Sequence, residues 1–432
     1  MSVFFESIWG NVPLKRGTSK IGSGKTPSGG AESYATSGVT FLRSQNIHFG
    51  GLRLDDVAYI DAATHYEMRG TRVQVGDVLL NITGASLGRA AYAPNNLGEA
   101  NVNQHVCIIR PSRHFDTRFL TYALSSHPTQ EQIRQLQVGG NREGLNFEQV
   151  GNLTVPNAPL DEQRRIADFL DAETARIDTL TAAKERASAL IDERRLALTS
   201  QMCLRGVDVN TPMRDTGIGP LGSVPAHWPI MRNKTFMREI IDLSQEGNEE
   251  LLTVSHLTGV TPRSEKIVYM FQAETMIGYK LCRPGDLVIN TLWAWMGALG
   301  VSRHEGIVSP AYGVYRFTAP EILPEYFDLL FRTPEYVTEM TRYSKGVWTS
   351  RLRLYPESFL ALRTPVPPLA EQKSIVDTVQ RETAPGLKLQ DAIRRSNLLL
   401  AERRQALITA AVTGQFDVST ASGRNVTEGV TV

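Results

Sequence analysis

Two long stretches of the chain place apolar residues three and four positions apart. The first runs from Leu160 to about Leu204, with apolar positions at Leu170, Ile177, Leu180, Ala187, Ile191 and Leu198. The second runs from Leu369 to about Thr413, with apolar positions at Val379, Leu389, Ile393, Leu400 and Leu407. This period predicts helices with one apolar face. At about 1.5 Å per residue, roughly 43 residues span about 64 Å, too long for one small domain. We expect the two helices to pack on each other as a coiled coil.

Prolines mark where both helices begin. The segments 155–159 and 364–368 carry prolines that cannot lie inside a helix, and Asp161 is a suitable N-cap for the first helix. Pro385 and Gly386 fall inside the second stretch. We therefore expect that helix to kink or break there, in two pieces, with the longer piece beginning near Leu387.

The two halves of the chain repeat each other with a displacement of 209 positions. The matched pairs include Glu162 and Glu371, Gln163 and Gln372, and the Glu-Arg-Arg triplets that begin at Glu193 and Glu402. A repeat of this length decides how the fold is organised. Each half consists of a globular part followed by a long helix.

The globular parts read as mixed strands and short helices. In the first half, the runs 39–43, 57–60, 78–82 and 106–109 are apolar or β-branched and predict strands, and 119–124 predicts a helix. The run 75–82 matches 284–291 in the second half. We expect a mixed α/β (α+β) fold with two similar globular domains and two long antiparallel helical spacers. The expected segments are 1–152, spacer 153–206, 207–362, spacer 363–417, and a flexible tail 418–432.

Composition narrows the class of protein. The chain has 432 residues, 41% of them hydrophobic and 21% charged, and a net charge of +1. Three separated cysteines suggest a reducing compartment. The absence of a long apolar run or a signal peptide predicts a cytoplasmic protein without a membrane partner. A near-neutral chain can hold nucleic acid only through a local surface.

Catalytic motifs are weak. The segment 19–26 ends Gly-Lys-Thr like a phosphate-binding loop, but Ser19 stands where that motif requires glycine, and Pro27 follows. A Gly-rich loop that brings Lys25 to a DNA phosphate, or a plain turn, fits better. The eight histidines lack metal-ligand spacing, so we expect no metal site. No sequence marks a methyltransferase pocket or a nuclease cluster.

A basic stretch with aromatic residues, 342–353, is the clearest candidate for DNA contact, although such runs are commonly only solvated faces. Trp293 and Trp295 follow a strand, and we expect both to pack in the core. Asn103 and Gln104 could pair with adenine or form a turn. The full set of DNA-contact candidates is Lys25, Arg43, Arg72, Arg89, Asn103, Gln104, Arg142, Arg263, Arg342, Lys345, Trp348, Arg351 and Arg353.

With both helices and both sets of anchors placed, the sequence resembles the DNA-specificity (S) subunit of type I restriction-modification systems. The residues that carry the resemblance are the segments 159–163 and 368–372 before the long helices, Gly76-Asp77, Gly285-Asp286, the segment 24–27, Asn46-Ile47 and the segment 221–228. Each motif is modest alone, and their duplicated order over nearly the whole chain is specific.

The resemblance implies a non-catalytic subunit that reads a bipartite double-stranded DNA target with two target-recognition domains. It implies two methyltransferase subunits and, in the full complex, two restriction subunits as partners. S-adenosylmethionine, ATP and Mg would bind to those partners and not to this chain. The spacers would carry the partner-binding residues Glu162, Gln163, Glu193, Arg194, Arg195, Glu371, Gln372, Glu402, Arg403 and Arg404.

Three alternatives remain from the residues alone. A stand-alone DNA-binding regulator would bind a specific target tightly without partners. A nucleotide hydrolase would depend on Lys25 and Thr26. A coiled-coil scaffold would not contact DNA at all.

Overall fold

The computed structural model describes residues 7–137, 144–266, 275–347, 351–415 and 417–418. Contacts divide the chain into two compact units, which are called unit 1 and unit 2 below. Unit 1 consists of Met1–Lys184 and Arg394–Val432, and unit 2 of Glu185–Ile393. Arg142 and Trp348, two of the candidate DNA contacts, lie outside the described residues.

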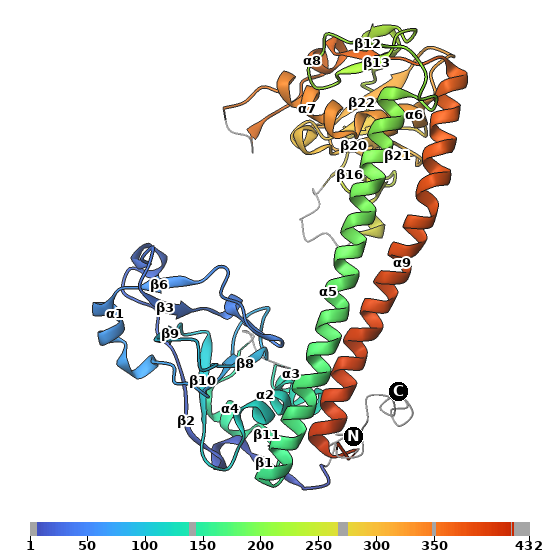
Figure 1. The fold of residues 1–432 in the computed structure, drawn as a ribbon. Coiled ribbons are helices and arrows are strands. Elements are labelled where there is room, and N and C mark those ends of the chain that lie inside the picture. The colour runs from blue at the N-terminus through green and yellow to red at the C-terminus, as the bar shows by residue number, and fades with distance from the viewer. Residues whose placement is uncertain (1–6, 138–143, 267–274, 348–350, 416, 419–432) are drawn as a thin grey trace. The chain divides into compact units, whose positions relative to one another are not determined.

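Both predicted long helices are confirmed. Helix α5 spans Leu160–Arg205 and helix α9 spans Leu369–Thr413 (Figure 1). Each helix contributes one segment to each unit. The prediction of Asp161 as N-cap is wrong by two residues, because α5 begins at Leu160 and Pro159 precedes it. The backbone N–H of Gln163 bonds the carbonyl of Pro159, which places Asp161 inside the first turn.

Within each unit the two helix segments are antiparallel, as predicted. In unit 1, Asp178 of α5 pairs with Arg404 of α9, and Lys184 pairs with Ser396. In unit 2, the amide of Gln390 donates to the carbonyl of Ser188 at 3.0 Å. Residue numbers rise along α5 as they fall along α9. The apolar faces of the two helices therefore pack on each other, and the two chain segments run in opposite directions.

The predicted break in the second helix is wrong. Helix α9 continues through Pro385 without interruption. The ring of Pro385 is exposed, while Gly386 faces α5 so closely that a Cβ there would lie 2.9 Å from Ile191 Cγ2. Proline removes one backbone hydrogen bond and crowds the preceding turn. Packing against α5 on the opposite side keeps the helix continuous despite that cost.

Unit 1 is built on a four-stranded antiparallel sheet with the order β2-β10-β7-β8. It also has a β1–β11 pair, a three-stranded sheet β6-β3-β9 and a β4–β5 pair. Its strands are β1 (Asn11–Pro13), β2 (Thr18–Ser23), β3 (Val39–Leu42), β4 (Ile47–His48), β5 (Gly51–Leu52), β6 (Ala58–Ile60), β7 (Val78–Asn81), β8 (Ala90–Tyr92), β9 (Ala100–Val102), β10 (Val106–Pro111) and β11 (Thr154–Pro156). Its short helices are α1 (Ala62–Glu67), α2 (Thr117–Ser125), α3 (His127–Gln135) and α4 (Phe147–Asn152). The four predicted strands and the predicted helix are confirmed.

Unit 2 repeats this plan with the order β15-β22-β19-β20. The β14–β23 pair corresponds to β1–β11, and β12–β13, β16–β17 and β18–β21 form three further pairs. Its strands are β12 (Met213–Asp215), β13 (Ser223–Pro225), β14 (Ile230–Arg232), β15 (Met237–Glu239), β16 (Leu252–Ser255), β17 (Gly259–Pro262), β18 (Lys280–Cys282), β19 (Leu287–Ile289), β20 (Leu299–Val301), β21 (Gly306–Val308), β22 (Gly313–Phe317) and β23 (Arg363–Pro365). Its short helices are α6 (Pro324–Phe331), α7 (Pro334–Tyr343) and α8 (Pro356–Ala361). The division of the chain into recognition and spacer segments at the expected boundaries stays a prediction.

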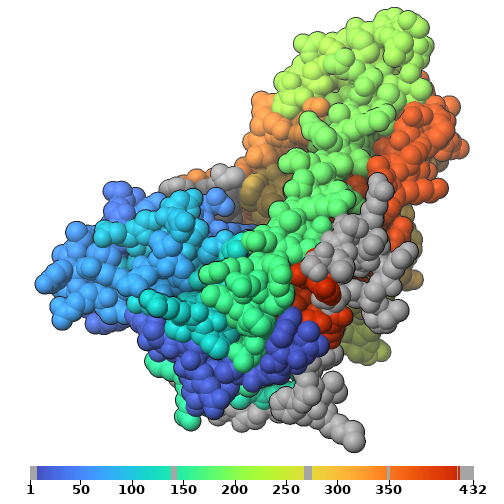
Figure 2. Space-filling view, turned by 60° about the horizontal axis from the view of Figure 1, so that its bottom comes forward, coloured from blue at the N-terminus to red at the C-terminus, as the bar shows by residue number. Residues whose placement is uncertain are grey.

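The ends of both long helices are anchored in the cores. In unit 1, Ile166 and Leu170 of α5 and Leu407 of α9 pack with Phe119. Figure 2 shows the blue N-terminal segment beside the green start of α5 and the red end of α9, and the N–H of Ile8 bonds the carbonyl of Thr413. The core of unit 2 is aromatic. It combines the α9 residues Ile375 and Val379 and the α5 residues Cys203 and Leu204 with Trp228, Tyr315, Tyr326, Phe327, Phe331, Tyr336 and Phe359. Burial of this much apolar surface fixes each helix end to its own unit.

Among the described residues, no helix has the length and apolar character needed to cross a membrane.

Candidate nucleic-acid interface

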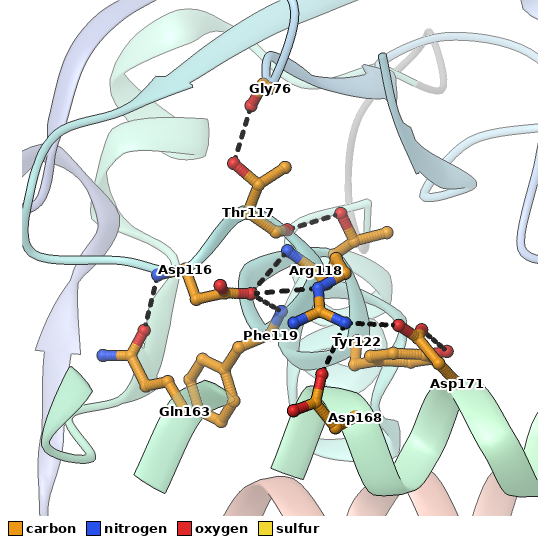
Figure 3. A network of polar contacts seen from close by, with 10 residues as sticks. Gly76, Asp116, Thr117, Arg118, Phe119, Tyr122, Gln163, Asp168 and Asp171 are labelled. Atoms are coloured by element: carbon orange, nitrogen blue, oxygen red, sulfur yellow. Dashed lines mark hydrogen bonds and ion pairs between the residues drawn. The ribbon is translucent and has the colours of Figure 1, made fainter. Parts of the chain in front are cut away.

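A polar network joins α2 to α5 in unit 1 (Figure 3). Arg118 donates to Asp168 Oδ1 at 2.8 Å and to Asp171 Oδ2 at 2.7 Å, and Tyr122 donates to Asp171 Oδ1 at 2.8 Å. Burial opposes the charge of Arg118, but these hydrogen bonds raise its pKa overall. Burial also raises the pKa of Tyr122. The network fixes α2 on the spacer, and sequence reasoning missed it because nothing in the spacing of these residues pairs them.

Gln163 lies at the centre of the same contact. Its side-chain oxygen accepts from the N–H of Asp116 at 2.8 Å, and its amide nitrogen donates to the carbonyls of His114 at 3.0 Å and Ala158 at 2.8 Å. Asp116 in turn caps α2 by accepting from the N–H of Phe119 at 3.1 Å. Side-chain amides can satisfy several buried backbone groups at once. Gln163 is fully buried.

Gln372 repeats this arrangement in unit 2. Its oxygen accepts from the N–H of Leu323 at 2.8 Å, and its nitrogen donates to the carbonyls of Glu321 and Pro367 at 3.0 and 2.8 Å. Gln372 is also fully buried. The assignment of Gln163 and Gln372 to a partner-binding surface is therefore corrected, because neither side chain reaches the surface of its unit. Both hold the entry of a long helix against a recognition domain.

The other candidates for partner contact lie at or near the surface. The exposed ones are Glu193, Arg194, Arg195, Glu402 and Arg403, and the half-buried ones are Glu162, Glu371 and Arg404. Arg195 pairs with Asp192 at 3.3 Å, and three others also have partners within the chain. Glu371 accepts from His227 Nε2 at 2.7 Å and from Trp228 Nε1 at 2.9 Å, Glu162 pairs with Arg165, and Arg404 pairs with Asp178.

A buried ion pair recurs in both units. Asp77 accepts two hydrogen bonds from Arg110, at 2.7 and 2.8 Å, and Asp286 accepts two from Arg316, both at 2.8 Å. The hydrogen bonds with Asp77 raise the pKa of Arg110, and those with Asp286 raise that of Arg316. Each pair ties the turn before a central strand to the neighbouring strand. The Gly-Asp dipeptides noted in the sequence are therefore structural anchors.

The Gly-Lys-Thr segment is not a phosphate-binding loop of the nucleotide-hydrolase type. Residues 18–23 form β2, whereas that loop would lie between a strand and a helix. The N–H of Gly24 bonds the carbonyl of Val106 at 3.1 Å, and a Cβ on Gly24 would lie 1.7 Å from Val102 O. Only glycine permits this close approach. The side chain of Lys25 is exposed beside it.

Polar side chains gather around this loop. Thr26 donates its hydroxyl hydrogen to Gln104 Oε1, and Gln104 is exposed. His105 Nδ1 lies 2.6 Å from Thr83 Oγ1. Asn103 is buried, and its side-chain oxygen accepts from the N–H of His105 at 3.1 Å. Lys25 and Gln104 thus present a cation and an amide on one surface, while Asn103 holds the turn.

The remaining arginine candidates of unit 1 are partly buried. Arg43 donates to the carbonyl of Asp56 at 3.2 Å and lies over the ring of Tyr34. Arg72 donates to the carbonyl of His65 at 3.4 Å. Arg89, which directly precedes strand β8, is half-buried. Stacking and backbone contacts account for Arg43 and Arg72 without DNA.

The basic stretch of unit 2 contains a short antiparallel pairing. Lys345 and Arg353 exchange two backbone hydrogen bonds of 2.9 Å each. Both cations flank the ring of Tyr355, at 5.8 and 5.5 Å from its centroid. Arg351 is exposed. Arg342 is exposed but pairs with Glu339 at 2.9 Å, so part of its charge is offset within α7.

The end of this stretch and Tyr312 both contact the residues that follow β19. Asn290 donates to the hydroxyl of Tyr312 at 3.2 Å. Burial raises the pKa of Tyr312, and the nearby charge of Arg263 partly opposes that rise. The N–H of Leu354 bonds the carbonyl of Thr291 at 3.0 Å. Arg353, which precedes Leu354, is therefore close in the chain to the turn after β19.

The expectation that Trp293 and Trp295 pack in the core is wrong. Trp293 is 51% exposed, and Trp295 is half-buried with its indole N–H donating to the carbonyl of Leu292 at 3.1 Å. Both follow the end of β19 in a turn with a short 3-10 helix, Ala294–Met296. The strand alternation used for the prediction does not extend into this turn.

Within the described part of the chain, no three His, Cys, Asp or Glu residues are grouped to hold a metal ion.

Known proteins share sequence and fold features with this chain. A family model described as the type I restriction modification DNA specificity domain matches residues 67–188. The specificity subunit of the type I restriction enzyme EcoKI from Escherichia coli (strain K12) is 19% identical over 395 residues, which cover 88% of this chain and 82% of that protein.

Solved structures give the fold. One, from work on complex assembly and conformational transition of the type I restriction-modification system, has a TM-score of 0.64 at 17% identity. That similarity covers 94% of this chain and 98% of the other. The HsdS subunit from Thermoanaerobacter tengcongensis has a TM-score of 0.45 at 17% identity, over 94% of this chain and 97% of that one.

The matched segment of this chain, residues 67–188, is a type I restriction modification DNA specificity domain.

The curated relative is a specificity subunit, and the matched domain of this chain is described as a DNA specificity domain. In unit 1, Lys25 lies next to Thr26, which is hydrogen-bonded to Gln104. In unit 2, Lys345 and Arg353 lie together at the ring of Tyr355. Which side chains touch DNA stays a prediction.

Proposed function

We propose that this specificity subunit reads a bipartite double-stranded DNA target, with unit 1 reading one half-site and unit 2 the other. The observation that carries the proposal is the repeated sheet order, β2-β10-β7-β8 in unit 1 and β15-β22-β19-β20 in unit 2. The same framework carries different loops, polar around Gln104 and basic with aromatic residues around Arg353. Two related readers with unlike loops imply two unlike half-sites.

The long helices supply the gap between the half-sites in this proposal. Helices α5 and α9 each pass from one unit into the other without interruption. A continuous helix has a fixed rise per residue. An insertion of four residues after Leu180, with a matching insertion in α9 at the facing position, should therefore change the tolerated gap and leave both half-sites the same. An unchanged gap would contradict the role of the helices as a spacer.

The catalytic work falls to partner subunits. The similarity to a structure from work on complex assembly of a type I system supports assembly of this chain into such a complex. We propose two methyltransferase subunits, which bring S-adenosylmethionine, and two restriction subunits, which bring ATP and Mg. The exposed spacer residues Glu193, Arg194, Arg195, Glu402 and Arg403 are proposed docking points.

A stand-alone DNA-binding regulator is the second candidate, and the net charge of +1 argues against it. Phosphate contacts by cations supply much of the affinity for DNA, so a neutral chain alone should bind weakly at physiological salt.

Methylome mapping tests the function directly. Cells that express the methyltransferase subunit with and without this chain should differ by one bipartite methylated motif. Replacement of residues 207–362 by the corresponding domain of another specificity subunit should change one half of that motif only. A motif that does not depend on this chain would refute the proposal, and so would a replacement that changes both halves.

A further inference from the structure

Unit 2 exposes a compact group of apolar side chains in the turn between β19 and β20. Leu292 is 44% exposed, Trp293 51% and Met296 37%. Single exposed apolar residues are ordinary, but adjacent large ones on one turn mark a surface that another molecule covers.

The turn is rigid although its side chains are exposed. The N–H of Trp293 bonds the carbonyl of Asn290 at 3.0 Å, and the N–H of Ala298 bonds the carbonyl of Trp293 at 3.2 Å. Ala294 is buried. Gly297 has a φ of 79° and lies against Val337 of α7. The indole of Trp293 is therefore held out on a fixed backbone, which reduces the ordering cost of binding.

Cations of the 342–353 stretch approach this turn. The backbone bond between Leu354 and Thr291 places Arg353 next to the start of the turn, and Lys345 pairs with Arg353. An apolar aromatic side chain bordered by cations complements nucleic acid, with stacked bases inside and phosphates outside.

We propose that Trp293 stacks on, or inserts between, bases of the half-site read by unit 2, and that this contact makes Trp293 a specificity-determining residue. The proposal rests on the proposed function of unit 2 as a DNA reader. Apolar side chains that wedge into a base step unstack it, and the cost depends on the sequence of the step. Trp293 therefore favours a flexible pyrimidine–purine step in that half-site.

The corresponding turn of unit 1 has a different character. It consists of Thr83, Gly84, Ala85 and Ser86. Thr83 is hydrogen-bonded to His105, and the hydroxyl of Ser86 accepts from Asn81 at 3.0 Å. These small polar residues provide no aromatic surface at this position. Stacking is expected in the half-site of unit 2 and not in that of unit 1.

The experiment uses the full chain assembled with its methyltransferase partner. Wild type, Trp293→Ala, Trp293→Phe and Leu257→Ala complexes select duplexes from a randomised pool, and the affinity for the selected duplex is then measured. Leu257 is the matched control, because it is 73% exposed and apolar and lies in the same unit. A second series of the selected duplex carries 2-aminopurine at each position of the second half-site, so that fluorescence reports unstacking.

Trp293→Ala removes the stacking contact with a base, so it should weaken binding by at least about fivefold. The loss should relax selection in the second half-site only, and 2-aminopurine fluorescence should rise at one step with wild type and Trp293→Phe but not with Trp293→Ala. Leu257→Ala should bind like wild type.

Other outcomes separate the proposals. If wild type selects no sequence, the proposed function fails, and this inference fails with it. If wild type selects a bipartite site and Trp293→Ala retains its affinity and selection, DNA reading stands and the role of Trp293 is overturned. A Trp293→Ala complex that loses methyltransferase but binds DNA normally would instead assign the turn to a protein partner and overturn the inference.

Discussion

The side-chain oxygen of Gln163 accepts a hydrogen bond from the backbone N–H of Asp116 at 2.8 Å, inside the contact between α5 and the first recognition domain. Gln372 makes the equivalent bond with Leu323 in unit 2. Gln163 and Gln372, near the starts of α5 and α9, therefore each join a long helix to the globular part of its unit. Orientation of a reading surface depends on such a joint.

Gln163→Leu should destabilise unit 1. The change leaves the N–H of Asp116 and the carbonyls of His114 and Ala158 without their partner, and buried unsatisfied groups cost about 1–3 kcal/mol each. We expect a loss of about 2–4 kcal/mol after partial relaxation. Hydrogen exchange of α2 and α7 amides during mild urea titration would locate the loss in α2.

Glu162→Gln is the matched control, because Glu162 pairs with Arg165 on the helix surface. Its effect should stay within about 0.5 kcal/mol. Gln372→Leu should produce the mirror result, with faster exchange in unit 2. Equal exchange in both units for either variant would show that the glutamines do not act locally.

Pro385→Ala should stabilise unit 2. Proline inside a helix costs up to about 3 kcal/mol relative to alanine, through a lost N–H and crowding of the preceding turn. Pro385 is exposed, so alanine meets no obstacle. The expected gain of about 1–3 kcal/mol would appear as a higher midpoint of thermal unfolding.

Gly386→Ala gives the contrast. A Cβ at Gly386 would lie 2.9 Å from Ile191 Cγ2, so the side chain of Ile191 or the helix must shift. We expect a smaller gain or a loss, because that clash offsets the better helix propensity of alanine. A gain from Gly386→Ala as large as that from Pro385→Ala would show that α9 is not closely packed on α5 there.

The parts of this fold that could be predicted are the elements whose apolar residues recur at a regular spacing. Residue spacing predicted helices α5 and α9 from their apolar stripes. It also predicted the strand that begins at Val78. Continuity through Pro385 was not, since it depends on support from Ile191 across the helix pair. Local rules describe what proline costs, and only packing shows whether that cost is offset.

The site divides in the same way. The cations Lys25 and Arg353 were recognisable from their neighbours in sequence. Gln163 looked like a surface residue because its burial comes from Asp116, 47 positions away. Trp293 looked like a core residue because a strand precedes it, and the turn that exposes it is set by α7. Contacts between distant segments decide both cases.

The cysteines should be unreactive and should make the protein sensitive to alkali. Burial raises the pKa of Cys107 and Cys282 to about 12, and raises that of Cys203 as well. Thiolate is the reactive form, so a thiol reagent at pH 8 should label none of the three in the folded chain and all three in denaturant.

The pH dependence has a definite sign. The folded-state pKa values lie above the ordinary value of 9.0, so the unfolded chain loses these protons first as pH rises. Stability is fully present below about pH 9 and falls between about pH 9 and 12. Thermal midpoints measured from pH 7 to 11 should decline above pH 9, and a flat profile would contradict the burial of these thiols.

Gln104 and Lys25 should affect DNA binding in different ways although they are neighbours in unit 1. An exposed amide can read a base edge, so Gln104→Ala should cost about 1–3 kcal/mol on the selected sequence and relax one position of the first half-site. Lys25 offers only a point charge, so Lys25→Ala should weaken all duplexes alike and reduce the salt dependence of binding by about one ion.

Competition with single-base variants of the selected duplex at two salt concentrations separates the two effects. Arg118 is unsuitable as a control because it supports α2, whereas Lys388→Ala removes an exposed cation of α9 that is not a proposed docking point and should leave both measurements unchanged. A uniform loss from Gln104→Ala would assign that residue to the backbone of the DNA and leave the reading of the first half-site to other side chains.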